Sequence, residues 1–177
     1  FTQFFGQFVA HDIVFSAGGE DDVDGQLNGT TRNAGETVDG VRQQINEETA
    51  HLDLGQVYDN DPERAPLLRD PESGRMLTRD DGLLPGADDI ARAHGVEVGE
   101  GQAIEASPVV TGDFRAAQTE QLLTHHTIWL KNHNYHADRL AEQFPDWDRD
   151  QIFHAARALN EAEFQSVVYD EYLPAII

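Results

Sequence analysis

The chain contains no cysteine, and this absence excludes several kinds of chemistry at once. Disulfide bonds, thiolate catalysis, and zinc or iron–sulfur sites built on cysteine are all ruled out. No run of apolar residues approaches the roughly 20 needed to cross a bilayer, and no basic stretch followed by an apolar one marks a signal peptide. The sequence therefore indicates no membrane segment and leaves the compartment open.

Basic residues are also scarce. The chain has 12 Lys and Arg against 33 Asp and Glu, a formal net charge of −21, and Lys131 is its single lysine. Such a charge argues against nucleic acid and anionic membranes as partners. An acidic, lysine-poor surface is typical of a salt-adapted protein, because high salt screens the self-repulsion. An ordinary acidic protein is the alternative interpretation.

At 177 residues and 39% hydrophobic residues, the chain is long enough to form one domain with a core. It opens inside an apolar helical pattern and closes on the apolar run from 172 to 177. We therefore expect it to be an internal piece of a larger protein.

Residues 1–15 predict an amphipathic helix, because Phe1, Phe4, Phe5 and Phe8 recur at helical spacing. Gln7 and His11 are four residues apart and share a different stripe, while Asp12 points in a third direction. A single histidine beside an apolar stripe is most often a core residue. This pattern alone therefore does not define a site.

The remaining pattern predicts a mainly α protein with long irregular loops. Residues 16–40 are expected to form a loop, whose acidic cluster is read as solvated rather than calcium-binding: Glu20, Asp21, Asp22 and Asp24. Residues 59–111 are rich in Pro and Gly and predict irregular structure with short pieces near 65–69 and 75–77. Two long helices are expected at about 115–143, after Asp113 as N-cap, and at about 148–169. No alternating strand pattern is seen.

Oxygen donors alternate at Thr49, His51 and Asp53, so an extended backbone would direct them to one side. Hydroxyl, carbonyl and carboxylate oxygens of this kind suit Ca²⁺. By itself the pattern is a weak signal.

Several blocks occur in a distinctive order: GQFVAHD at 6–12, RQQIN at 42–46, GDFR at 112–115, LLTHHTIWLKNHN at 122–134 and YDEYLP at 169–174. With these blocks the chain resembles the animal-type haem peroxidases of the peroxidase–cyclooxygenase superfamily, across nearly its whole length apart from the variable loops. The resemblance implies that residues 1–177 form the distal half of an incomplete peroxidase-like helical domain. It also implies haem b as cofactor, hydrogen peroxide as substrate, and a small reductant or halide as the second substrate.

The resemblance assigns roles to three residues on the distal side of the haem. His11 matches the distal histidine, which moves a proton between the oxygens of bound peroxide. Arg115 matches the distal arginine, a permanent positive charge that stabilises developing negative charge and would keep the imidazole neutral. Gln7 matches the glutamine that positions peroxide, water or halide.

A structural calcium site is implied in the same way. Asp12 matches the family's calcium-binding aspartate, and Thr49, the His51 carbonyl and Asp53 match the ligands of the calcium loop. With Asp12 tied to the metal, the rotation of the helix that aims His11 is fixed. Gly55 stands where a serine ligand is usual, so we expect weaker calcium affinity.

Two departures concern the haem itself. Mammalian members bond it covalently through an Asp and a Glu whose places are taken here by Ala10 and Gln118, and Thr119 replaces a methionine that forms a third link in one member. The haem is therefore expected to be non-covalent, with Gln118 still bordering it. The proximal histidine of the family follows the YLP block, so we expect it beyond Ile177 and expect the chain alone to be inactive.

Two other functions stay open. One is a fatty-acid dioxygenase of the same superfamily. The other is a non-catalytic calcium- or transition-metal-binding module, based on Asp12, Asp53 and the histidine-rich helix with its four histidines: His125, His126, His133 and His136. Packing is the favoured role for His126 and His133. The family resemblance suggests secretion, and the oligomeric state is left open.

Overall fold

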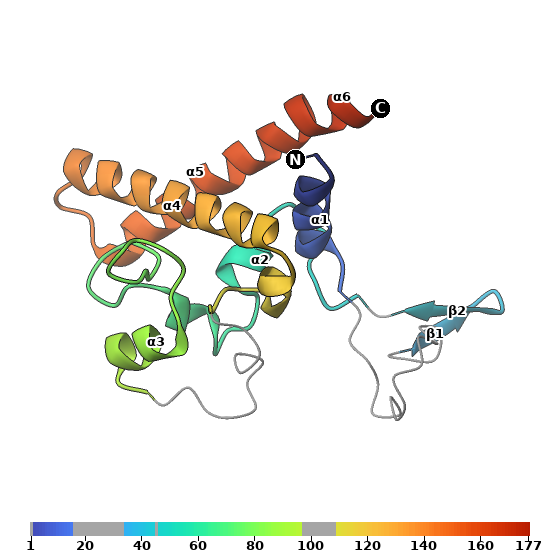
Figure 1. Ribbon diagram of the computed structural model, residues 1–177, viewed down its shortest axis with the longest axis horizontal. Helices are drawn as coiled ribbons and strands as arrows, with labels where there is room; N and C mark the ends of the chain where they lie inside the picture. The colour runs from blue at the N-terminus through green and yellow to red at the C-terminus, as the bar shows by residue number, and fades with distance from the viewer. Residues whose placement is uncertain (1, 16–33, 45, 97–108) are drawn as a thin grey trace.

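The computed structural model describes residues 2–15, 34–44, 46–96 and 109–177. The acidic cluster at 20–24 lies outside these residues, as does Phe1. The described part confirms a mainly α architecture, built around long helices that cross one another (Figure 1). In chain order the elements are α1 (Thr2–Ile13), β1 (Ala34–Val38), β2 (Val41–Gln44), α2 (Gly55–Tyr58), η1 (Ala65–Leu68), α3 (Ala87–His94), η2 (Phe114–Gln118), α4 (Glu120–Gln143), α5 (Arg149–Ser166), η3 (Val167–Tyr172) and α6 (Leu173–Ile176).

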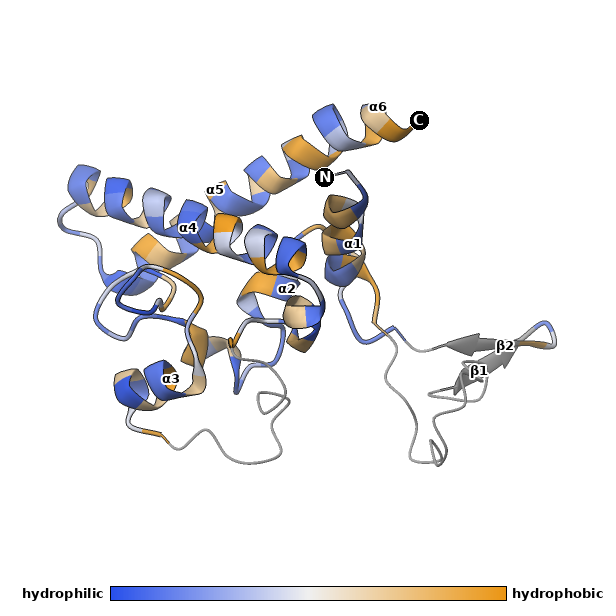
Figure 2. Ribbon diagram, in the orientation of Figure 1, coloured by the Kyte–Doolittle hydropathy of each residue, from blue (hydrophilic) through white to orange (hydrophobic). Residues whose placement is uncertain are grey.

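The helix α4 is the centre of the fold, because α5, α1, α2 and η2 all pack against it. Its buried face includes Leu122, Trp129 and Leu130, which join one continuous hydrophobic core with residues from the other helices. Hydrophobic residues run along α1 and form the end of α6, whereas the outer turns of α4 are hydrophilic (Figure 2). Burial of the apolar faces at about 25 cal/mol per Å² holds these helices together.

The predicted aromatic stripe packs α1 into this core. Phe5 is 5% exposed and Phe8 is fully buried. The Phe8 ring meets Phe164 of α5 edge-on at 5.8 Å, and the Phe5 ring meets Tyr172 at 5.2 Å. Edge-on aromatic pairs of this kind add to the stability gained from burial alone. They fix one face of α1, so its other residues are presented in defined directions.

The expectation of no strands is wrong for residues 34–44, which form an antiparallel hairpin. Its turn is Asp39-Gly40, with φ values of 52° and 78°. Positive φ at both central residues matches the right-handed twist of the flanking strands, and an Asp-Gly pair adopts this conformation readily. The strands are short, with an irregular register between Ala34 and Thr37, which explains why no alternation stood out. In Figure 1 the hairpin projects away from the helices.

The helix expected at 115–143 is in fact two elements. Asp113 accepts a hydrogen bond from the Arg115 N–H and so caps the short 3₁₀-helix η2, not the long helix. Thr119 then adopts an extended conformation with φ −146°, and its hydroxyl oxygen accepts from the Leu122 N–H at 3.1 Å to begin α4. Threonine is a favourable N-cap, which accounts for the break.

Two further helical segments differ from expectation. The stretch 59–111 contains α3, which begins after Gly86, where the Asp89 carboxylate accepts from the Gly86 N–H, and ends at Gly95 with φ 66°. The expected short piece near 65–69 is confirmed as η1. The last long helix does not end near 169 but continues through the π-helical turn η3 into α6. α6 contains Pro174, which cannot donate a backbone hydrogen bond, and the wider π-helical turn comes directly before it.

Candidate active site

The predicted distal residues His11 and Arg115 lie beside each other, although they are 104 positions apart in the chain. The carboxylate of Asp113 lies between them. Its Oδ2 is 3.1 Å from Nδ1 of His11, although the geometry is not that of a hydrogen bond. Both side chains are almost fully buried, with His11 6% and Asp113 4% exposed. The two helical elements α1 and η2 therefore meet at a charged, buried contact.

The Arg115 guanidinium is held by acceptors on both elements. Its Nε donates to the two carboxylate oxygens of Asp113 at 2.9 and 3.0 Å. Its Nη2 donates to the His11 carbonyl at 3.1 Å, and Nη1 donates to the Val14 carbonyl at 3.0 Å. A positive charge at the C-terminal end of a helix is favourable, because the last carbonyls lack helical partners. Arg115 thus caps α1 and places a fixed charge beside His11.

Asp113 is a residue of this junction that sequence reasoning missed, since it was interpreted only as an N-cap. Burial alone would raise the pKa of Asp113, but the contacts with His11 and Arg115 outweigh burial and hold this pKa below its ordinary value. The carboxylate is therefore ionised at neutral pH. The sequence did contain a signal for Asp113, because its carboxylate lies two residues before Arg115, a predicted active-site residue. On the extended backbone of Asp113, that spacing places the two side chains near each other.

The two glutamines of the predicted site also meet across the same pair of elements. Nε2 of Gln7 donates to Oε1 of Gln118 at 3.0 Å. Gln7 is half-buried and Gln118 is exposed. Four predicted residues thus come together where α1 meets η2: Gln7, His11, Arg115 and Gln118.

The predicted calcium ligands converge beneath α1. Asp12 is fully buried, and its Oδ1 accepts from the Gly55 N–H at 2.7 Å. The same N–H approaches Oδ1 of Asp53 at 3.2 Å, and the Thr49 hydroxyl donates to Oδ2 of Asp53 at 2.9 Å. The Thr49 hydroxyl also lies 3.5 Å from the His51 carbonyl. Hydroxyl, carbonyl and carboxylate oxygens therefore gather within a few residues of Asp12.

The electrostatics of this cluster are unfavourable in the absence of a cation. Burial first, and then the nearby Asp53 charge, raise the pKa of Asp12 from 3.8 to about 7. Oδ2 of Asp12 is buried without a hydrogen-bond partner. Within the described residues no group of three or more His, Asp or Glu side chains is arranged to hold a metal. A cation here would rest on two carboxylates together with the hydroxyl and carbonyl oxygens.

The short helix α2 connects this cluster to the segment that carries Asp113 and Arg115. The Gln56 side chain donates to the Phe8 carbonyl of α1 at 3.2 Å. On the other side, a Cβ on Gly112 would lie 2.4 Å from both the Gly55 carbonyl oxygen and the Asp59 nitrogen. Such a contact is with backbone, which cannot swing aside, so only glycine allows this approach. α2 therefore fixes the spacing between α1 and η2.

The histidines of α4 do not form a common metal site. His133 contacts the Tyr58 hydroxyl through Nδ1 at 2.9 Å and the Gly74 carbonyl through Nε2 at 3.0 Å, and burial lowers its pKa to about 4. His126 is fully buried, neither ring nitrogen has a partner, and burial lowers its pKa to about 3. His136 instead pairs with Glu163 at 3.0 Å. The favoured packing role of His126 and His133 agrees with these contacts.

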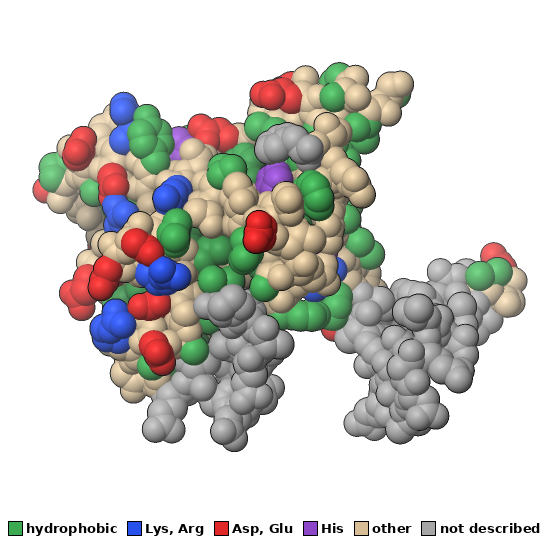
Figure 3. Space-filling model, viewed as in Figure 1, with side chains coloured by type: hydrophobic (Ala, Val, Ile, Leu, Met, Phe, Trp, Pro, Cys, Tyr) green, Lys and Arg blue, Asp and Glu red, His purple; other side chains and the backbone are tan. Residues whose placement is uncertain are grey.

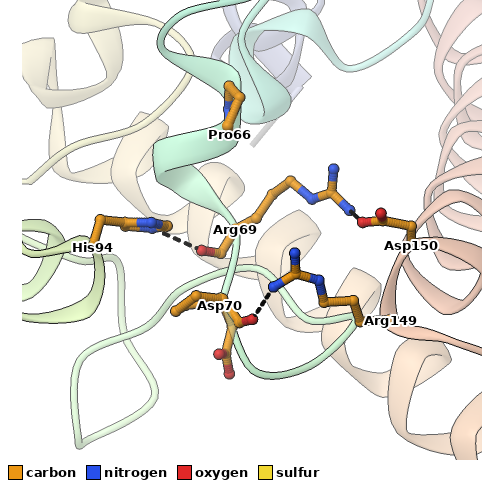
Figure 4. A pocket seen from close by; sticks show the side chains of 7 residues that line it. Pro66, Arg69, Asp70, His94, Arg149 and Asp150 are labelled. Atoms are coloured by element: carbon orange, nitrogen blue, oxygen red, sulfur yellow. Dashed lines mark hydrogen bonds and ion pairs between the residues drawn. The ribbon is translucent and has the colours of Figure 1, made fainter.

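A separate cleft of about 290 Å³, lined mainly by charged residues, lies between η1, α3 and the start of α5 (Figure 4). Its charged groups are already partnered: Arg69 pairs with Asp150 at 2.6 Å, Arg149 donates to the Pro71 carbonyl, and His94 contacts the Arg69 carbonyl at 3.0 Å. On the face shown in Figure 3, arginines are similarly interspersed with acidic side chains. None of the predicted site residues lines this cleft.

Comparison with known proteins decides the family. The family model described as animal haem peroxidase matches residues 27–177. The chain belongs to the animal haem peroxidase family. The matched range includes the predicted calcium loop and Arg115, while α1 precedes it.

Relatives in this family span several animals. The chain is 33% identical over 141 residues to the mouse peroxidasin homolog, covering 77% of this chain and 10% of that protein. It is 33% identical over 140 residues to a Drosophila melanogaster peroxidase, covering 78% of this chain and 20% of that protein. Similarity to Heme peroxidase 2 of Caenorhabditis elegans, at 27% identity, covers 96% of this chain and 27% of that protein, and so extends into α1. The chain thus spans a small part of these animal haem peroxidases.

Solved structures show the same fold. Peroxidase A from Dictyostelium discoideum superimposes with a TM-score of 0.74 at 24% identity, over 98% of this chain and 39% of that one. A fatty acid α-dioxygenase from Oryza sativa superimposes with a TM-score of 0.63 at 19% identity, over 94% of this chain and 27% of that one. The helical arrangement of this haem peroxidase family member is therefore shared with both kinds of enzyme.

Proposed function

We propose that this chain forms the distal side of a haem peroxidase pocket, in which His11 moves the proton and Arg115 supplies a fixed positive charge. The observation that carries the proposal is the convergence of these two residues on Asp113, from segments 104 residues apart. Membership of the animal haem peroxidase family supports the same reaction class. Residues 1–177 would then be the distal part of the catalytic domain.

The residues present fit a haem at this place. Within the described part of the chain, Nε2 of His11 has no hydrogen-bond partner, so it is free to face a ligand. Gln7, which is half-buried, and Gln118, which is exposed, border the same junction. Neither Ala10 nor Gln118 carries a carboxylate, so the haem would be haem b held without ester bonds. When bound, the haem supplies the iron that binds and activates hydrogen peroxide.

The protein side chains would handle protons and charge during this reaction. Nε2 of His11 would accept a proton from hydrogen peroxide and return it to the departing oxygen, which leaves as water. The Arg115 guanidinium would stabilise negative charge as the O–O bond lengthens, without reorganising, because its bonds to Asp113 and to α1 already hold it. Gln7 would orient peroxide or a small donor at the edge of the pocket.

A calcium ion would complete the cluster beneath α1. Its ligands would be the carboxylates of Asp12 and Asp53, the Thr49 hydroxyl and the His51 carbonyl. The buried, unpartnered Oδ2 of Asp12 supports this assignment, because an isolated buried carboxylate oxygen is costly unless a cation balances it. The ion would lock the rotation of α1 and so the direction of His11, one residue away.

The second substrate would be a small phenol or a halide. Fatty-acid dioxygenase activity is the second candidate, favoured by the fold shared with the Oryza sativa α-dioxygenase. The two functions differ in their oxidant, since a dioxygenase would oxidise a fatty acid with O₂ and without added peroxide.

The test is to reconstitute the full-length protein with haem b and to follow phenol and bromide oxidation. We expect peroxide-dependent turnover, and His11→Ala should slow the reaction with peroxide at least about 100-fold. The matched control is His154→Ala, because His154 is exposed on α5, far along the chain from the predicted site. Equal rates for wild type and His11→Ala would refute the assignment, and peroxide-independent fatty-acid oxidation would establish the second candidate.

A further inference from the structure

The two nitrogens of His11 face different surroundings. Nδ1 lies 3.1 Å from the Asp113 carboxylate, whereas Nε2 has no hydrogen-bond partner in the described part of the chain. A neutral imidazole carries one proton, and the group beside one nitrogen decides which nitrogen holds it. The chemistry of a distal base depends on this choice, because only the unprotonated nitrogen can accept a proton.

The Asp113 carboxylate cannot turn away from His11. One of its oxygens accepts from the Arg115 backbone N–H at 2.8 Å, and both oxygens accept from Arg115 Nε. Its own backbone is tied to Thr111, whose hydroxyl donates to the Asp113 carbonyl at 2.7 Å. The side chain is 2% exposed. The negative charge beside Nδ1 is therefore a fixed feature of the fold.

We propose that Asp113 is a positioning residue that keeps the neutral His11 proton on Nδ1 and so leaves the lone pair of Nε2 available to accept a proton. An unprotonated Nδ1 would direct its lone pair at a carboxylate 3.1 Å away, which is electrostatically unfavourable in a buried place. A proton on Nδ1 turns that repulsion into attraction. The tautomer follows from the geometry alone, while its catalytic consequence rests on the proposed function.

The pair formed with Arg115 also holds the Asp113 carboxylate in place. Arg115 Nε donates to both Asp113 oxygens, so part of the carboxylate charge is already balanced. The remaining oxygen lone pairs are enough to prefer a donor at Nδ1. Asp113 thus orients two predicted site residues together, His11 as a base and Arg115 as a fixed cation.

The first test reads the tautomer directly in the chain without haem. The protein is labelled with ¹⁵N-histidine, the His11 ring signals are assigned by their loss in His11→Asn, and two-bond ¹H–¹⁵N correlations show which ring nitrogen carries the proton at pH 8. We expect the proton on Nδ1. A proton on Nε2 in the wild type would overturn the proposal, whatever the variants do.

The second test asks whether the carboxylate is the cause. In Asp113→Asn we expect the Nδ1-protonated population of His11 to fall, and in Asp113→Glu we expect it to recover. The matched control is Asp59→Asn, because Asp59 is also buried and pairs with an arginine, Arg64, at 2.7 Å but does not contact His11. An unchanged His11 tautomer in folded Asp113→Asn, or an equal change in Asp59→Asn, would contradict the proposal.

The haem-reconstituted protein separates this inference from the proposed function. We expect Asp113→Asn to slow the reaction with peroxide at least about tenfold and Asp113→Glu to restore part of it, since a wrong tautomer disables a base that is still in place. If His11→Ala has no effect while the wild-type tautomer is on Nδ1, the peroxidase assignment fails and the tautomer assignment stands. If His11→Ala is slow but Asp113→Asn is fully active, the positioning role fails and the peroxidase assignment stands.

Discussion

Asp12→Asn gives the sharpest test of the cluster beneath α1. Asp12 is fully buried, and its pKa is raised from 3.8 to about 7 by burial and by the neighbouring Asp53 charge. Asparagine has nearly the same shape, and its carbonyl oxygen can still accept from the Gly55 N–H, which Asp12 binds at 2.7 Å. The substitution therefore removes the titrating charge and little else.

The sign follows from the raised pKa. A carboxyl group whose pKa is higher in the folded than in the unfolded protein contributes stability below pH 3.8, and this contribution is lost as the pH rises to about 7. The whole shift corresponds to about 4 kcal/mol, because one pKa unit is about 1.4 kcal/mol. About 3 kcal/mol of this stability is lost between pH 5 and pH 8. Both pH values lie above the isoelectric point of about 4.4.

The assay is urea unfolding in a chelator at pH 5 and pH 8. The free energy of unfolding of Asp12→Asn relative to wild type should rise by up to about 3 kcal/mol between these pH values. Added calcium at pH 8 should then stabilise the wild type, by about 2.7 kcal/mol at 100 times its dissociation constant, and leave Asp12→Asn unaffected. The control Asp88→Asn removes an exposed carboxylate on α3 and should show neither effect. A stability difference that does not change with pH would refute the reasoning.

Three further substitutions test the framework by urea unfolding. Gly112→Ala should lower the free energy of unfolding by about 3 kcal/mol or more, because its Cβ would lie 2.4 Å from backbone atoms of α2. The control Gly40→Ala, with φ 78° but open space around it, should lower it by only about 1 kcal/mol. Equal losses in the two variants would contradict the close approach. Tyr58→Phe should cost about 1–3 kcal/mol, since it removes a hydroxyl that contacts His133 and Asn160 in a buried place, and no loss would show that water replaces it. Thr119→Ala should cost about 1 kcal/mol by removing the cap of α4, whereas Thr124→Ala, whose hydroxyl bonds only within the helix, should cost less.

Much of the helical framework could be predicted from sequence, because helix periodicity is a local property. The spacing of Phe5 and Phe8 predicted the buried face of α1, and the helix expected to end near 143 does end there, as α4. The positions of Gln7 and His11 on one stripe followed in the same way. The resemblance to the haem peroxidases then placed Arg115 in the same site, and the structure brings it to α1.

Element boundaries were less accurate where two local signals competed. Asp113 and Thr119 are both good N-caps, and only packing decided that a 3₁₀ turn lies between them before α4 begins. Gly86 and Gly95 suggested loop, yet they are the two ends of α3, because a glycine can cap a helix as well as interrupt one.

Tertiary structure alone decided how the site residues are held. The role of Asp113 depends on a contact between its carboxylate and a histidine about a hundred residues earlier, and no local pattern encodes that distance. The same holds for Arg115, whose guanidinium caps α1, and for Gly112, whose size is set by the backbone of α2. By itself the sequence determined which residue types were available and which helices would form, since those depend on neighbours within a few turns. The charges around His11 depend instead on segments brought together by burial of the common core, and so they appeared only in the folded chain.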